Sequence, residues 1–510
     1  MQPPAAAASA PLPLLVGLQA AVSGASLVVE IVAGRMLAPY VGMSLYTWTS
    51  VIAVVLAGFS AGHWWGGHVA ERPAPKALAI TGWVLLAAAA ATAGALLALR
   101  LIAGPVALAV THPVWNIAVL TLAVFFLPSL FAGVPAPVLA QIAVKGGGEK
   151  SGRALGMMFA AGAIGAIAGT LLAGFAFIPW LGTAATLAIV TGVYLAAAAS
   201  LLLVARKAAL AIPALAVAAL AVVLGAVSVT RVSPCTRESQ YFCIRVIDIS
   251  ADPASPVHRM VLDKLAHGAS ARDYPRVMFT EFTAMLDAIA RGRMGERPFS
   301  SFFIGGGTYS VPRAWADRET GPITVAEIDL QVTQAAVDDF WLDPSGMTIL
   351  HEDARRALLQ RADARYDVIV GDAFGDIAVP PHLITREFFE LVRARLEADG
   401  VFLMNVIDFP ERLHALASVA ETLRAVFPSV EIWTEEGPPE PGRQRVFVLV
   451  AGGQPTPFAS IDVPAPDVVR FAALADSFTD TLIAQRSTGV LTDDHAPIDR
   501  LLGGGLFSGS

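Results

Sequence analysis

The stretch FSSFFIGGGTYS, residues 299–310, decides the fold of the C-terminal half of the chain. It places a short apolar run directly before three consecutive glycines, which lead into a segment that can begin a helix. Glycine has no Cβ, so the backbone at such a turn can approach a ligand closely, and the amides that open the next helix can donate to that ligand. Glycine triplets also occur elsewhere in proteins, so the interpretation depends on the strands that follow.

Strands alternate with helices on the C-terminal side of the triplet. After the first strand, apolar strands are predicted at ITVAEID (323–329), GMTILHED (346–353), YDVIVGDAF (366–374), GVFLMNVID (400–408), SVEIWTEE (429–436) and RVFVLVAG (445–452). This alternation predicts a mainly parallel α/β sheet. Seven strands with the last two antiparallel suit a Rossmann-like domain of the S-adenosylmethionine methyltransferase type, over residues 301–510. Short strands within 240–264 predict a small β-strand subdomain, which with a connecting helix occupies 232–300.

Acidic residues follow three of these strands, at the edge where open α/β sheets bind ligands. Glu327 ends the second strand, where an acid can accept hydrogen bonds from ribose hydroxyls. Asp353 follows the third strand, where it can accept from an adenine amino group, and Asp372 follows the fourth. Each acid alone could instead cap a helix. Together with the glycine triplet they predict a nucleoside pocket.

The first 231 residues differ sharply in composition from the rest. They hold ten Lys and Arg but three acids, whereas the remainder holds 25 bases and 39 acids. The acidic half argues against a nucleic-acid partner, because neutralising phosphates needs a basic face. Seven apolar segments of spanning length predict a multi-pass helical membrane domain, 1–231. These segments are about 12–34, 45–69, 77–99, 115–141, 154–178, 183–204 and 208–229. Small residues in FAAGAIGAIAGTLLAG (159–174) are typical of closely packed spans.

The sequence does not decide which side of the membrane holds the C-terminal domain. Basic residues lie in the second, fourth and sixth loops, and the positive-inside rule then places the end of a seven-span chain outside. Cys235 and Cys243, the only cysteines, could pair in an oxidising compartment. Against this, an enzyme that uses a nucleoside substrate is expected where that substrate is made, and one miscounted span reverses the answer.

Several motifs resemble spermidine synthase. They are ESQYFCIRV (238–246), VLDKLAHGA (261–269), GGGTYSVPR (305–313), AEID (326–329), HEDAR (351–355), YDVIVGDAF and GVFLMNVID. With the preceding spans, the chain resembles the bacterial membrane-fused spermidine synthase-like proteins of the polyamine aminopropyltransferase family. SLYTWTSVIAVVLAGFSAGHWWGG (44–67) and LTDDHAPID (491–499) are typical of that group.

This resemblance implies an activity: transfer of an aminopropyl group from decarboxylated S-adenosylmethionine to an amine such as putrescine, with release of methylthioadenosine. The donor is a co-substrate, and no further cofactor or metal is expected. The resemblance also implies the inner membrane of a bacterial cell and a homodimer. Asp372 would accept the proton of the attacking amine, and Tyr241 would line the amine site as a second catalytic residue.

The remaining roles come from the same resemblance. The donor-binding set is Gly305, Gly306, Gly307, Tyr309, Glu327 for the ribose, and Asp353 with Ala354 for the adenine. The candidates for binding the amine, or the ammonium of the donor, are Asp263, His267, Glu281 and Asp376. His382 is a further candidate for a polar contact.

The chain departs from the soluble enzymes mainly on the amine side. It has GGGTYS where they carry GGGDGG, and Gly375 replaces the second aspartate of the stretch that begins at Asp372. His267 and Thr280 replace a glutamine and a histidine. The amine acceptor therefore stays open.

Two other functions remain as alternatives. One is a methyltransferase that uses ordinary S-adenosylmethionine, which a base near residues 305–309 would favour; Arg313 is the only base nearby. The other is a transporter or sensor that binds a polyamine or nucleoside without turnover, a protein that would be expected to lose Asp372.

Overall fold

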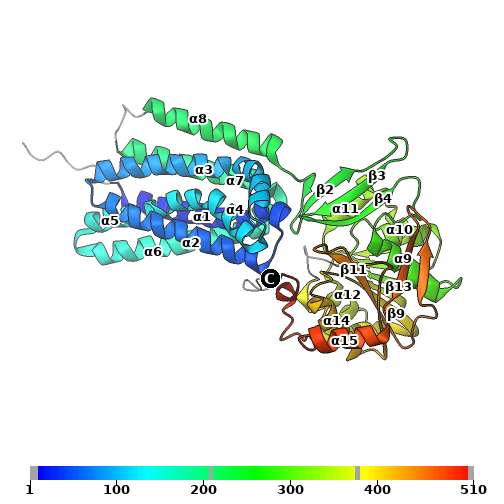
Figure 1. The fold of residues 1–510 in the computed structure, drawn as a ribbon. Helices are drawn as coiled ribbons and strands as arrows, with labels where there is room; N and C mark the ends of the chain where they lie inside the picture. The colour runs from blue at the N-terminus through cyan, green and yellow to red at the C-terminus, as the bar shows by residue number, and fades with distance from the viewer. Residues whose placement is uncertain (1–9, 206–210, 374–378, 504–510) are drawn as a thin grey trace, which may run out of the picture. The chain divides into compact units, whose positions relative to one another are not determined.

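The computed structural model describes residues 10–205, 211–373 and 379–503. The chain folds as two compact units, Met1–Cys243 and Ile244–Ser510 (Figure 1). The first unit is helical and the second is α/β.

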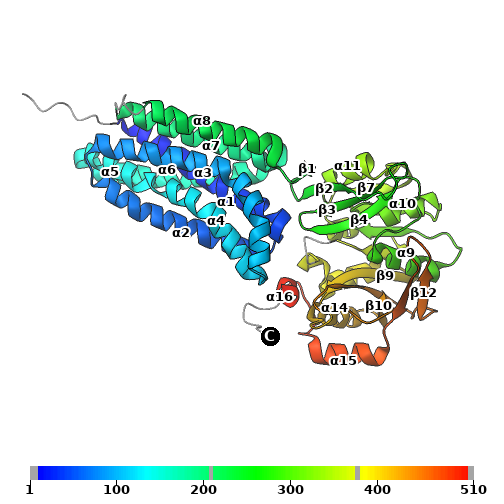
Figure 2. The same cartoon turned by 45° about the horizontal axis from the view of Figure 1, so that its top comes forward.

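Helices of the first unit lie side by side as a bundle (Figures 1 and 2). They are α1 (Leu12–Val41), α2 (Leu45–Ala70), α3 (Ala74–Ala109), α4 (Pro113–Gly133), α5 (Pro135–Gly147), α6 (Ser151–Leu172), α7 (Ile178–Val204) and α8 (Ala211–Val227). Several begin with proline in the first turn. Backbone amides in the first turn have no acceptor within the helix, so the missing N–H of proline costs no hydrogen bond there. Large apolar side chains also point outward from the bundle, among them Trp64, Phe159, Trp180 and Leu203.

Among the described residues, five helical stretches are long and apolar enough to cross a membrane, whereas the sequence predicts seven spans. Four of them correspond to α1, α2, α3 and the region of α8. The fifth is a run of 92 residues, Pro113–Val204, in which the sequence predicts three separate segments. Within this run α5 begins at Pro135, and Gly148 and Gly182 have φ of 52° and 75°. The regular helix is therefore interrupted near these points, although Pro113–Val204 is a single one of the five stretches.

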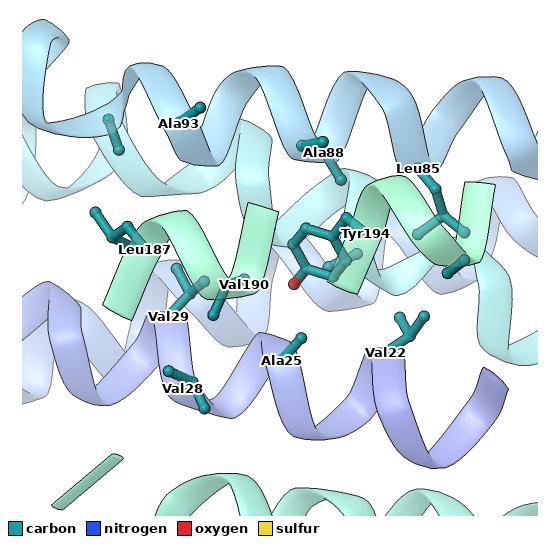
Figure 3. Packing of buried hydrophobic residues seen from close by; sticks show 14 of the residues in the cluster. Val22, Ala25, Val28, Val29, Leu85, Ala88, Ala93, Leu187, Val190 and Tyr194 are labelled. Atoms are coloured by element: carbon teal, nitrogen blue, oxygen red, sulfur yellow. The ribbon is translucent and has the colours of Figure 1, made fainter. Parts of the chain in front are cut away.

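The interior of the bundle is built from small and branched apolar side chains. Figure 3 shows Val22, Ala25 and Val29 of α1 facing Leu187, Val190 and Tyr194 of α7, with Leu85, Ala88 and Ala93 of α3 above them, while Val28 points to the other side of α1. All ten side chains are buried. The same helices also carry apolar residues on their outer sides, which is the pattern of a helix that exposes no face to water.

Glycine permits the closest contacts between helices. A Cβ on Gly62 of α2 would lie 2.2 Å from the carbonyl oxygen of Leu130 in α4. A Cβ on Gly165 of α6 would lie 2.1 Å from that of Ala20 in α1. Backbones that approach this closely gain dispersion contacts along both helices, which matters where no hydrophobic effect draws helices together.

Ser228–Val232 forms the last helical turn of the first unit. The segment that follows this turn is held against the bundle by several contacts. Cys235 and Cys243 form a disulfide with a Cα–Cα distance of 5.2 Å. The Arg35 guanidinium donates to the backbone carbonyls of Tyr241 and Ser239, the latter at 3.1 Å. Glu238 accepts from the Thr183 amide at 2.5 Å, at the start of the straight part of α7. These contacts explain why the first unit extends to Cys243, although the predicted boundary near Arg231 marks the end of its helices.

Two sheets follow the helices along the chain, and all their strands lie in the second unit except β1 and the first residue of β2. A small antiparallel sheet has the order β1 (Arg237–Glu238), β2 (Cys243–Asp248), β3 (Val257–Leu262) and β4 (Leu265–Ala271). Within the described ranges the large sheet has nine strands: β5 (Ser301–Ile304), β6 (Ile323–Ala326), β7 (Thr348–Leu350), β8 (Tyr366–Gly371), β9 (Leu396–Asp408), β10 (Ser429–Glu435), β11 (Arg445–Gly452), β12 (Ser460–Val463) and β13 (Val469–Ala473).

The large sheet runs in the order β12-β13-β10-β11-β9-β8-β5-β6-β7. Strands β5 to β9 pair in parallel, and β11 is antiparallel to both β9 and β10. The predicted Rossmann-like arrangement is confirmed, with two corrections. The sheet has nine strands where seven were expected, because β12 and β13 extend its edge. Of the last two predicted strands only β11 runs against the parallel set, since β10 reverses direction again.

Helices cover both faces of the large sheet. Alternate residues of β5 point to opposite faces, so Phe302 and Ile304 join one core while Phe303 joins the other. The first core is completed by α12 (Ala354–Gln360), α13 (Arg386–Arg395), α14 (His414–Arg424), α15 (Asp476–Arg486) and α16 (Ile498–Gly503). The second is completed by α9 (Glu281–Met294), α10 (Ser310–Asp317) and α11 (Leu330–Asp339).

The glycine contacts give the first testable prediction. Gly165→Ala should destabilise the bundle by about 1–3 kcal/mol, because the new methyl group has to displace the backbone of α1. Gly156 lies on the same helix with nothing within 4 Å of its Cβ position. Gly156→Ala should therefore be neutral or stabilising by up to ~1 kcal/mol, through helix propensity. Thermal unfolding of the detergent-solubilised protein measures both, and equal effects would contradict the assigned contact.

Candidate active site at the carboxyl ends of the sheet

The glycine turn, residues 305–307, is enclosed by backbone on both sides. A Cβ on Gly305, whose φ is 92°, would lie 2.5 Å from the carbonyl oxygen of Asp372 at the end of β8. A Cβ on Gly307, whose φ is 53°, would lie 2.8 Å from the carbonyl oxygen of His267 in β4. Only glycine fits either position. The turn therefore joins the small sheet to the carboxyl edge of the large one.

Glu327 is hydrogen-bonded to the backbone of this turn. Its carboxylate accepts from the Gly306 amide at 2.8 Å and from the Asp329 amide at 2.9 Å. Burial raises the pKa of Glu327, and the two amides oppose that rise. Each carboxylate oxygen retains a second lone pair. Glu327 can therefore accept from ribose hydroxyls while the amides hold it in place.

Tyr309 lies beneath the turn and has no exposed surface. A Cβ on Gly306 would meet its ring at 2.4 Å, and its hydroxyl shares a 2.7 Å hydrogen bond with Thr333. Burial raises the pKa of this phenol, so it stays neutral. The donor contact predicted for Tyr309 stays a prediction, since the structure places its side chain in the core as a support for the turn.

Asp372 lies at the end of β8, beside the glycine turn. Its amide donates to the Ile304 carbonyl at 3.0 Å, which fixes it against β5. Its carboxylate Oδ1 accepts from the Asn405 side-chain amide of β9 at 3.0 Å. Burial raises the pKa of Asp372 to about 6, and the bond from Asn405 opposes the rise.

Asn405 was missed at the sequence level. Its buried Oδ1 has no hydrogen-bond partner among residues 10–205, 211–373 and 379–503. The available signal was a polar side chain in the middle of an otherwise apolar strand, GVFLMNVID. A buried acceptor without a partner is costly, so this atom is suited to receive a donor from a bound ligand.

Asp353 caps α12 and contacts a histidine from a later loop. One of its carboxylate oxygens accepts from the Arg356 amide at 2.9 Å, and the other pairs with Nε2 of His382 at 2.7 Å. The hydrogen bond from His382 contributes most to lowering the pKa of Asp353. Ala354 is the first, buried residue of α12. Asp353 and its neighbour therefore stand at the third strand end as predicted, with His382 as an added partner.

The predicted amine-side residues are spread around the same edge. His267 contacts the glycine turn through its backbone, and burial lowers the pKa of its imidazole to about 4. Asp263 is buried at the β3–β4 turn with φ of 52°. Glu281 begins α9, and burial together with Glu435 raises its pKa to about 7. Its buried Oε1 has no hydrogen-bond partner within the part of the chain that the structure describes.

Two predicted residues are not among the described residues of the second unit. Tyr241 belongs to the first unit, where its backbone is held by Arg35 and its side chain is 39% exposed. Asp376 falls outside the described residues. The roles of both stay predictions.

Arg313 bears on the choice between donors. Its guanidinium donates to the carbonyls of Ala271 at 2.7 Å and Arg272 at 3.0 Å, at the end of β4. The base that could have paired with the carboxylate of ordinary S-adenosylmethionine is thus committed to the backbone. Within the described ranges, no group of three or more His, Cys, Asp or Glu side chains is placed to hold a metal ion.

No protein-family model matches the chain. The polyamine aminopropyltransferase of Vibrio vulnificus is 32% identical over 158 residues, which cover 30% of this chain and 51% of the relative. Polyamine aminopropyltransferase 1 of Aquifex aeolicus is 25% identical over 147 residues, covering 28% and 52%. The matched part of this chain is similar to polyamine aminopropyltransferases. It spans about half the length of these two relatives.

Solved structures of spermidine synthases also resemble part of this chain. A probable spermidine synthase from Corynebacterium glutamicum aligns with a TM-score of 0.44 and 19% identity, over 49% of this chain and 94% of that one. The spermidine synthase of Thermotoga maritima aligns with a TM-score of 0.33 and 19% identity, over 42% and 75%.

The pKa of Asp372 predicts how stability depends on pH. Its folded value, about 6, lies above the ordinary value near 3.9, so the folded unit holds this proton more tightly than the unfolded chain does. The stability linked to that proton is fully present below about pH 4 and is lost as the pH rises through about 6. Asp372→Asn removes the buried charge. It should raise the melting temperature at pH 8 by roughly 3 °C or more.

Thermal unfolding between pH 4 and 8 checks this expectation. The gain should shrink towards pH 4, where the native carboxyl is protonated. Asp399→Asn, at an exposed position in β9, is the matched control and should show no such trend. A variant at Asp372 that is less stable than the unmodified protein at pH 8 would contradict the assigned burial cost.

Proposed function

We propose that the second unit transfers an aminopropyl group from decarboxylated S-adenosylmethionine to an amine such as putrescine, releasing methylthioadenosine. The observation that carries the proposal is the position and environment of the Asp372 carboxyl group. It lies on the glycine turn with its pKa raised to about 6, beside the unpartnered acceptor atom of Asn405. The names of the similar proteins support the same reaction class.

The reaction needs one proton acceptor. An alkylammonium ion has no lone pair to attack with, so it first loses a proton to a nearby base. Its nitrogen then bonds to the aminopropyl carbon, while the carbon–sulfur bond breaks and its electron pair neutralises the sulfonium. No covalent intermediate with the protein is required. A carboxylate with a raised pKa is a better acceptor than an ordinary one, and Asp372 has that property.

Binding of the donor is assigned to the other strand ends. Glu327 would accept from the ribose hydroxyls, and Asp353 with Ala354 would hold the adenine. The guanidinium of Arg313 is occupied by backbone carbonyls, so it offers no partner for a donor carboxylate. This favours the decarboxylated donor over ordinary S-adenosylmethionine.

The amine side is assigned first to Glu281. Glu281 has a buried oxygen with no partner in the described ranges, and its pKa is raised to about 7. An ammonium group placed there would remove that cost. Asp263 and His267 complete the proposed amine site. The roles predicted for Asp376 and Tyr241, and the homodimer, are carried as part of the same proposal.

Turnover tests the proposal directly. The purified full-length protein, incubated with decarboxylated S-adenosylmethionine and a panel of amines, should release methylthioadenosine. Asp372→Asn should lower kcat by ~10²–10⁴ because the base is lost, while affinity for the donor stays within about threefold. The rate of the unmodified protein should fall as the pH drops below about 6, because protonated Asp372 cannot accept a proton.

The exposed variant Asp399→Asn is the control and should keep full turnover. Tight nucleoside binding without release of methylthioadenosine, for every amine, would refute the enzyme and leave a binding protein. Unchanged turnover in Asp372→Asn would refute Asp372 as the base.

We further propose that the first unit spans the bacterial cell membrane seven times. The apolar lengths of its helices and the large apolar side chains on its outside support a lipid environment. The stretch Pro113–Val204 then supplies three crossings: α4 with α5, α6, and α7. Its turning points are residues 148–150 and Gly182.

Charge and the disulfide support one orientation of the bundle. Of the ten bases in residues 1–231, seven lie in or beside the links α2–α3, α5–α6 and α7–α8. The other three, Arg35, Arg100 and Arg231, belong to the opposite end, where Arg100 donates to the Arg231 carbonyl at 3.0 Å and the disulfide lies. With the strongly basic end in the cytoplasm, the chain would leave the bundle on the oxidising side.

Reporter fusions test this orientation. Alkaline phosphatase fused after residue 245 should be active and a fluorescent protein there dark, with the reverse for fusions in the α2–α3 link at residue 73. Protease added to spheroplasts should then digest the second unit. A fluorescent, protease-protected C-terminal fusion would refute the orientation.

A further inference from the structure

The segment 491–496, within the LTDDHAPID stretch, reaches back to the N-terminus of α12. Asp493 accepts two hydrogen bonds from the guanidinium of Arg355, at 2.7 Å and 2.6 Å, one to each carboxylate oxygen. Thr385 donates to the same carboxylate at 2.7 Å. The bond from Arg355 contributes most to lowering the pKa of Asp493 to about 2. Two parallel bonds fix direction as well as distance, which a single ion pair does not.

Arg355 connects this contact to the residues proposed to bind the adenine. The same guanidinium donates to the His382 carbonyl at 3.2 Å. The imidazole Nε2 of His382 lies 2.7 Å from a carboxylate oxygen of Asp353. An ionised carboxylate only accepts, so Nε2 carries the proton in this contact. A path of direct contacts therefore runs from Asp493 through Arg355 and His382 to Asp353.

Backbone contacts hold the segment in register. The Arg386 amide donates to the Leu491 carbonyl at 2.9 Å, and the Leu491 amide donates to the Thr422 hydroxyl at 2.9 Å. The Asp493 amide donates to Glu387 at 3.1 Å. Leu491 itself is buried in the core that α13 and α14 share. The carboxylate of Asp493 is thus presented from a fixed backbone.

We propose that Asp493 is a positioning residue for the adenine of the bound nucleoside. It holds Arg355, and through it the loop that carries His382, so that His382 orients the carboxylate of Asp353. The inference rests on the proposed function to the extent that the ligand is an adenine nucleoside. Asp353 uses one lone pair of one oxygen for the Arg356 amide and one of the other oxygen for His382. The remaining lone pairs can accept from an adenine amino group only while the carboxylate keeps this orientation.

A role in stability alone makes a different prediction. If Asp493 only anchored the C-terminal segment, its loss would weaken all nucleosides alike or none. If it orients an acceptor for an amino group, its loss should act mainly on ligands that carry that amino group. Methylthioadenosine and its hypoxanthine counterpart, methylthioinosine, differ in this way at the base, because the second has a carbonyl in place of the amino group.

The experiment measures binding of these two nucleosides to the full-length protein by calorimetry. Asp493→Asn should weaken methylthioadenosine about three- to tenfold and change methylthioinosine less than twofold, so the preference for adenine narrows. Asp494→Asn makes the same charge change at the next, exposed residue and should alter neither affinity. Arg355→Ala should resemble Asp493→Asn, and the double variant should lose less than the two single losses multiplied together, because both act through one contact.

Three outcomes would overturn the inference: equal affinities in Asp493→Asn and Asp494→Asn, equal losses for both nucleosides, or no binding of methylthioadenosine by the unmodified protein. Melting temperatures of the variants show whether each is folded, and Arg355→Ala provides a second route if Asp493→Asn is not. Failure of the proposed function is seen separately. Binding of methylthioadenosine without aminopropyl transfer would refute the enzyme and leave the positioning role standing.

Discussion

Backbone meets backbone at the glycine turn, and the rest of the site depends on that contact. A side chain on Gly305 would collide with the end of β8, and one on Gly307 would collide with β4. Because neither position has a Cβ, the carbonyl of Asp372, the amide of Gly306 and the backbone of His267 come together at one edge of the sheet. Three regions separated by dozens of residues therefore share a single small volume, and their side chains can act on one ligand.

The acids at that edge differ in how their charge is compensated. Glu327 is held by two backbone amides, and Asp353 by an amide and an imidazole. Asp372 has a side-chain amide for its carboxylate, and burial dominates its pKa. Burial raises the pKa of Glu327 and of Asp372, whereas the hydrogen bond from His382 lowers that of Asp353. The local environment therefore decides how readily each carboxyl group takes up a proton.

Different contacts hold the helices of the first unit together. Its helices have apolar side chains on all sides, so burial of apolar surface does not choose which faces meet. Close approach at positions such as Gly62 and Gly165 contributes to the selection, since a side chain there would collide with the neighbouring backbone. The segment that follows the last helix is then fixed by charge. Arg35 and Glu238 bind backbone groups of the segment and of α7, and the disulfide closes its loop.

Local patterns were enough to predict the two-part organisation, the parallel strands and the acids at their ends. Strand periodicity, apolar runs and a glycine triplet are properties of neighbouring residues, and Glu327, Asp353 and Asp372 lie where those patterns place them. The count of strands was less accessible, because β12 and β13 are short, partly exposed edge strands with weak apolar patterns.

Pairing between distant residues was decided only by the tertiary structure. Asn405 reaches Asp372 across 33 positions, and Arg355 reaches Asp493 across 138. Tyr309 lies two residues after the glycine triplet and was predicted to contact the donor, yet packing turns its ring into the core beneath Gly306. The sequence by itself therefore determined which residue types stand at the strand ends. Which of them are buried, compensated or left without a partner depends on side chains that only folding brings near, and those contacts set the pKa and the chemistry of each group.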